Sequence, residues 1–116
     1  MSQQNIALLT LTILSTGALA ANRFATPAGA QAGADANTIG VSRTAAVGAG
    51  ENIPVDALGT TLVLSGAAFA KGASLKSDAN GKAITWASSG AKVAIALEAA
   101  TAADQLIEVF LVPNVA

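Results

Sequence analysis

Glycine and other small residues interrupt this chain so often that only short segments remain between them. Turn residues return roughly every 8–12 positions, a spacing typical of all-β sandwiches and barrels. The richest helix candidate, residues 97–106, covers about three turns and lacks an apolar stripe at helical spacing. The sequence therefore predicts an all-β fold: a small barrel- or sandwich-like domain of short strands with Gly/Ala-rich turns and at most one short helix, at 97–106.

Alternating apolar side chains and β-branched residues mark the expected strands. In residues 6–13, isoleucine and threonine favour a pleated strand that places Ala7, Leu9, Leu11 and Ile13 on one face. The same criteria predict further strands at 23–26, 38–42, 53–58, 60–65, 92–98 and 106–113.

Glycine, proline and turn-forming residues predict how some of these strands connect. Gly59 is expected to turn 53–58 and 60–65 into a hairpin. Pro54 indicates an edge strand or a first strand residue, because proline has no N–H to donate to a neighbouring strand. Residues 78–81, Asp-Ala-Asn-Gly, predict a turn.

The last segment, 106–113, carries apolar side chains on both faces of the expected strand. They fall into two sets: Ile107, Val109 and Leu111 on one face, and Leu106, Phe110 and Val112 on the other. Glu108 shares the second face, and we expect the segment 106–113 to lie near the core.

The opening stretch, 5–24, has two interpretations. Its apolar run followed by Ala-Leu-Ala is similar to an export signal that would remove residues 1–20. However, residues 1–22 contain no Lys or Arg, and Thr10 and Thr12 interrupt the run. The run is also too short and too polar for a membrane span, which needs ~20 largely apolar residues. We therefore favour a retained strand, with an exported β-protein as the alternative.

Composition limits the classes of partner. Hydrophobic residues make up 53% of the chain and charged residues 11%, against about 25% charged in typical soluble domains. Much of the apolar content is alanine, which buries little area, so we expect the chain to associate with other chains. The net charge of -1 and the scattered Lys and Arg argue against nucleic-acid binding.

Catalytic and ligand-binding motifs are not met. Because the chain contains no Cys or His, disulfides, the usual zinc sites and Ser-His-Asp triads are excluded. Serine and lysine pairs occur at chance spacing, and 80–82 and 48–50 fail the phosphate-loop and dinucleotide patterns. The dispersed aspartates fit turn or surface roles: Asp35, Asp56, Asp78 and Asp104. We predict no catalytic, cofactor or metal residues and no enzyme activity.

The aromatic residues and the polar start are the remaining candidates for contacts. Phe24, Phe69 and Phe110 are expected in the core, because so few other large side chains are available to fill it. Trp86 fits either a partly buried position at a strand end or a partner interface.

Residues 1–5 are predicted to form a flexible N-terminal arm. Within it, Gln3, Gln4 and Asn5 are candidates for a partner interface, because an extended arm can pair with a partner as an added strand.

Several stretches in order resemble the capsid cement, or head decoration, proteins of tailed bacteriophages: "GAQAGADANTIGVSRT", "GENIPVDALGT", "SGAAFAKGASLKSDANGKAITWASSGAKV" and "ALEAATAADQLIEVFLVP". The resemblance implies a single decoration domain over 1–116, a β-rich fold, and no catalysis. It further implies a homotrimer on the outer surface of the virion, bound to the major capsid protein and holding capsid subunits against the pressure of packaged DNA, without contact to nucleic acid or membrane.

Overall fold

The computed structural model describes residues 6–87 and 89–112, and this part of the chain is all β, without a helix. The strands in chain order are β1 (Ala7–Leu14), β2 (Phe24–Ala25), β3 (Gly40–Ser42), β4 (Asn52–Leu64), β5 (Ser74–Ser77), β6 (Ala83–Thr85), β7 (Ala94–Ala96) and β8 (Leu106–Leu111). The predicted all-β class is confirmed. The sequence permits a short helix at 97–106, but residues 97–105 form the loop from β7 to β8.

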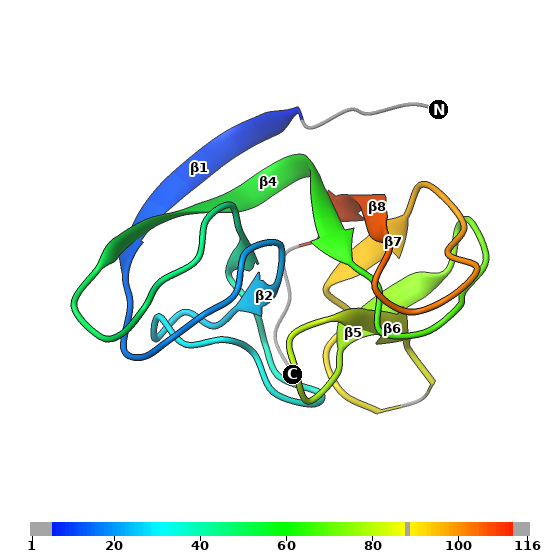
Figure 1. Ribbon diagram of the computed structural model, residues 1–116. Helices are drawn as coiled ribbons and strands as arrows, with labels where there is room; N and C mark the ends of the chain where they lie inside the picture. Colours follow the sequence, from blue (N-terminus) through cyan, green and yellow to red (C-terminus); the bar gives the residue numbers. More distant parts are fainter. Residues whose placement is uncertain (1–5, 88, 113–116) are drawn as a thin grey trace.

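The strands form one antiparallel sheet that curls into a nearly closed barrel (Figure 1). Its order is β2-β3-β4-β8-β7-β5-β6, and β1 pairs with β4 beside this path. Near the open seam, the Phe24 N–H at β2 donates to the Gly81 carbonyl in the β5–β6 turn, at 2.8 Å. The Asp35 N–H likewise donates to the Ser77 carbonyl of β5, at 3.1 Å. Loop hydrogen bonds therefore link the two ends of the sheet.

Strand β4 is the longest strand and organises the rest. Its first half pairs with β1 and β3, and its second half pairs with β8. The predicted hairpin at Gly59 is wrong, because 53–58 and 60–64 belong to this one strand. Gly59 has a φ of +97°, and a Cβ there would lie 2.3 Å from the Ile6 carbonyl oxygen. Glycine therefore permits the bend in the middle of β4 that Figure 1 shows.

Pro54 lies inside β4 and not on an edge strand, so that prediction is also wrong. It stands opposite Thr12 of β1, and its carbonyl accepts the Arg43 N–H at 3.0 Å, just beyond the last β3 pair, Ser42 with Val55. The missing proline N–H thus falls where the ladder with β3 ends, so no regular strand bond is lost.

Strand β1 forms as expected but is largely exposed. Its register with β4 shifts between Ala7 and Thr10, and the less exposed residues beyond the shift are Leu11 and Ile13. Leu8 and Leu14 are 76% and 59% exposed. Figure 1 places β1 along the outside of β4. The apolar run of the segment that is similar to an export signal thus forms a paired strand of the sheet at Ala7–Leu14.

The main core lies between the curled faces of the sheet. Phe24 and Phe69 are buried in it, as predicted, together with the inward set of β8: Ile107, Val109 and Leu111. Phe110 is 46% exposed, so its predicted core position is wrong. A strand directs alternate side chains to opposite faces, and Phe110 has the parity opposite to Val109.

Candidate partner-binding surface

An exposed apolar surface covers the outer side of the sheet where β4, β8 and β7 meet. In β8, Leu106 and Phe110 point away from the core; they pair with Leu64 and Thr60 of β4. Ile95 of β7 pairs with Phe110 from the other side. We call this surface the β8 face and define it by six residues: Leu62, Leu64, Ile95, Leu106, Glu108 and Phe110.

Glu108 lies at the centre of the β8 face. By register it stands directly opposite Leu62, with Leu106 and Phe110 as its neighbours on the same side of β8. Glu108 is only 6% exposed, whereas Leu106 and Phe110 are 49% and 46% exposed. The expected position of this segment near the core is confirmed by its other face, Ile107, Val109 and Leu111, which lies in the core. Within 6–87 and 89–112, its carboxylate takes part in no ion pair and accepts no hydrogen bond.

A second carboxylate lies beside the first. Glu98, in the loop after β7, accepts the backbone N–H of Glu108 through Oε1 at 2.9 Å. The Leu97 N–H donates to the Glu108 carbonyl at 3.0 Å, which holds the loop against this part of β8. The centre of the β8 face therefore carries negative charge within an apolar border.

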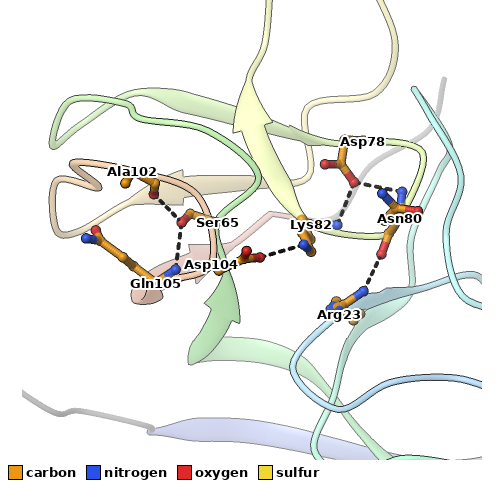
Figure 2. A network of polar contacts seen from close by, with 8 residues as sticks. All are labelled: Arg23, Ser65, Asp78, Asn80, Lys82, Ala102, Asp104 and Gln105. Atoms are coloured by element: carbon orange, nitrogen blue, oxygen red, sulfur yellow. Dashed lines mark hydrogen bonds and ion pairs between the residues drawn. The ribbon is translucent and has the colours of Figure 1, made fainter.

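Ser65 fixes the loop that leads into β8 (Figure 2). Its hydroxyl donates to the Ala102 carbonyl at 2.8 Å and accepts the Gln105 N–H at 3.0 Å. Its backbone also bonds to Asp104 and Gln105. Because Ser65 follows directly on β4, these bonds lock the start of β8 to the end of its partner strand.

An ion pair connects this loop to the β5–β6 turn. Lys82 pairs with Asp104, as Figure 2 shows. The hydrogen bond and positive charge of Lys82 lower the pKa of the Asp104 carboxyl below its ordinary value. The turn itself is held by Asp78, whose Oδ1 accepts the N–H groups of Asn80 and Lys82, and Arg23 donates to the Asn80 carbonyl. The predicted turn at 78–81 is confirmed, and the Lys82–Asp104 ion pair connects it to the loop before β8.

Asp56 is a second polar centre, at the junction of β1, β3 and β4. It is 0% exposed, so the prediction of a turn or surface role is wrong for this aspartate. Its two carboxylate oxygens accept the hydroxyls of Thr10 at 3.0 Å and Thr61 at 2.8 Å, and Arg43 lies 3.5 Å away. These partners satisfy the buried charge and tie β1 and the residue after β3 to β4. The other three aspartates lie in turns or loops, as expected: Asp35, Asp78 and Asp104.

One apolar hollow of about 360 Å³ opens on another side of the molecule. It lies between Leu9 and Leu11 of β1, the 37–40 segment and Leu111 at the end of β8. Its lining contains no acid, base or thiol, so it offers no group for proton transfer. In the described part of the chain, no three Asp or Glu side chains gather into a metal-binding group.

Trp86 lies directly after β6 and is partly buried, which matches one of its two interpretations. Its indole N–H donates to the Gly90 carbonyl at 2.9 Å, and the Lys92 ammonium stands 4.3 Å from the ring centroid. The ring thus holds its own loop in place. Its role in a partner interface stays a prediction. Gln3, Gln4 and Asn5 lie outside the described residues, and their role stays a prediction as well.

The family model of the phage cement proteins matches residues 2–111. The chain belongs to the phage cement protein family. This family consists of virion structural proteins, so the resemblance inferred from the sequence is confirmed. The match begins before β1, which does not favour the interpretation of residues 1–20 as a cleaved export signal.

The fold also occurs in a solved phage protein. The head fiber gp8.5 N base of bacteriophage phi29 is similar to this chain with a TM-score of 0.72 and 18% sequence identity, over 90% of this chain and 94% of the phi29 chain. At this identity the likeness shows a shared fold. No curated protein sequence matches this chain. Between residues 6 and 112, leaving out residue 88, no helix is long and apolar enough to cross a membrane.

Proposed function

We propose that this cement-family protein binds the outer surface of a phage capsid and holds neighbouring capsid subunits together against the pressure of packaged DNA. The observation that carries the proposal is the β8 face, an exposed apolar surface on the sheet of a member of the phage cement family. Apolar patches of this kind on soluble proteins mark interaction sites.

The work assigned to the protein is adhesion and not catalysis. A cement protein that binds the mature shell more tightly than other capsid states shifts the equilibrium toward the mature shell. The apolar hollow and the scattered carboxylates suit no reaction that we can derive, so we propose that the protein is not an enzyme.

We further propose that it acts as a homotrimer with the major capsid protein as its partner. Exposed apolar side chains outside the β8 face support self-association: Leu8 and Leu14 on β1 are more than half exposed. Sedimentation velocity of the purified protein measures this state directly, and a monomer at all concentrations would contradict the trimer.

Heads that lack the protein test the proposed function. We expect such heads to lose DNA or rupture on heating and in low salt, and we expect added purified protein to restore their resistance. Heads that are equally resistant with and without the protein would refute the cementing role.

A further inference from the structure

Glu108 sets a condition on anything that covers the β8 face. Its side chain is almost buried, yet it lies among apolar side chains that reach further into solvent. A partner seated on Leu106 and Phe110 removes the last water from the carboxylate. An ionised group that loses its water without gaining a partner opposes binding strongly. An apolar partner alone is therefore a poor match for this face.

The described residues contain no cation that serves this purpose. Their ion pairs join other carboxylates: Arg43 with Asp56, Lys76 with Asp35, and Lys82 with Asp104. Glu98 accepts the backbone N–H of Glu108, so it brings a second carboxylate to this position and not a positive charge. Within 6–87 and 89–112, therefore, no ion pair complements the charge of this face.

We propose that the β8 face binds a capsid subunit that presents an arginine or lysine within an apolar patch, and that this cation pairs with Glu108. The inference rests on the proposed function and names the chemistry of the partner surface. Leu106 and Phe110 supply apolar contact around the pair and exclude water from it, the arrangement found at energetic centres of interfaces. A partner surface that is only apolar leaves the Glu108 carboxylate without a partner and binds weakly, so this residue supplies specificity.

Charge also argues against a second copy in twofold contact through this face. A twofold contact places a residue against its own counterpart near the axis. It would bring the Glu108 carboxylates of two copies together in an apolar environment, where like charges repel strongly. A surface of opposite charge satisfies the β8 face, and a twofold contact with its own copy does not.

The substitution Glu108→Gln tests the proposal, because it keeps the shape of the side chain and removes its charge. The matched control is Asp35→Asn, which removes one negative charge from a loop outside the β8 face and suits the positive φ of 62° at that position. The probe is isolated mature heads of the phage that encodes this chain, prepared without the protein and titrated with labelled protein at two salt concentrations.

We expect Glu108→Gln to raise the Kd for heads about tenfold or more and to weaken its salt dependence, since one charged pair is lost. The Asp35→Asn protein should bind like the original protein. The unfolding midpoint of Glu108→Gln should equal or exceed that of the original protein, because the substitution removes a nearly buried charge without a partner. Weaker binding together with a lower unfolding midpoint would indicate a structural role and overturn the proposal.

Other outcomes separate this proposal from the proposed function. Equal Kd values for Glu108→Gln and the original protein overturn the inference and leave the cementing role intact. No binding of the original protein to heads contradicts the proposed function itself. If Glu108→Gln forms a smaller assembly than the original protein in sedimentation velocity without heads, the face belongs to a second copy and the inference is wrong.

A second substitution tests the apolar border of the same face. Phe110→Ala should weaken binding to heads while leaving the fold intact, because the ring is 46% exposed and outside the core. Val47→Ala is the control, since Val47 is 90% exposed in the loop between β3 and β4 and is not part of the β8 face. Equal binding of both variants and the original protein would overturn the assignment of the β8 face.

Discussion

Removing the carboxylate of Asp56 should destabilise the fold severely, although the residue lies in no proposed binding surface. The side chain is 0% exposed and accepts two hydroxyl hydrogen bonds, from Thr10 of β1 and Thr61 of β4. A hydrogen bond to a charged group contributes about 1.5–3 kcal/mol. Its ion pair contributes less, about 1 kcal/mol at most, because Arg43 is about half exposed.

Asp56→Ala loses both hydrogen bonds and leaves the Thr61 hydroxyl buried without its acceptor. Part of this loss is offset, because the variant no longer buries a charged group. We therefore expect a loss of about 2–4 kcal/mol in the free energy of unfolding. Asp56→Asn keeps the shape and can still bond both hydroxyls, one as acceptor and one as donor, so its loss should stay near 1 kcal/mol.

Urea unfolding at fixed protein concentration measures both variants, with the fluorescence of Trp86, the sole tryptophan, as the signal. Far-ultraviolet circular dichroism on the same samples checks that one transition is followed. The reasoning fails if Asp56→Ala unfolds within about 0.5 kcal/mol of the original protein, or if Asp56→Asn is the more damaging change.

Two further predictions concern the loop network and the close packing of β3. Because Lys82 lowers the pKa of Asp104, the pair stabilises the fold above the ordinary carboxyl range and loses this contribution as the pH falls through the lowered pKa, below about pH 4. NMR titration should show the Asp104 carboxyl protonating at higher pH in Lys82→Met than in the original protein; identical titrations would contradict the ion pair. Gly40→Ala should cost about 3 kcal/mol or more, because its Cβ would lie 1.9 Å from the Asp56 carbonyl oxygen. Gly33→Ala, which meets no atom within 4 Å, should leave stability unchanged or slightly raised in the same urea assay, and equal effects at both positions would refute this packing argument.

Local patterns in the sequence were sufficient to predict the fold class and several elements. The alternation in 106–111 correctly placed Ile107 and Val109 on one face and Glu108 on the other. The Asp-Ala-Asn-Gly turn formed where its residue types predict it, since its bonds run within a few residues of Asp78. These features depend on neighbours in sequence, which a sequence displays directly.

The errors occur where a distant contact decides the outcome. Gly59 bends a continuous strand instead of ending it, because the Ile6 backbone packs against it across β1. Asp56 is buried because hydroxyls from two strands meet there, and neither lies next to it in sequence. The size of Phe110 predicts a core position, but its parity is opposite to that of Val109 and places it on the outer face of the sheet.

The sequence predicts only part of the candidate partner-binding surface. The residues of β8 on the side of Glu108 could be named, but not the pairing with β4 and β7 that makes them one surface. The sequence features that indicate an interface, Trp86 and the polar residues 1–5, are an isolated aromatic residue and a short terminal stretch. An interface built from three strands has no comparable signature in the sequence.

The orientation of the protein on the capsid tests the central claim most directly. A cryo-electron microscopy map of decorated mature heads, at a resolution that shows side chains, should place the β8 face against the shell with Leu106 and Phe110 in contact and an arginine or lysine of the capsid subunit beside Glu108. A map in which the β8 face points into solvent, away from every capsid subunit, would contradict the account.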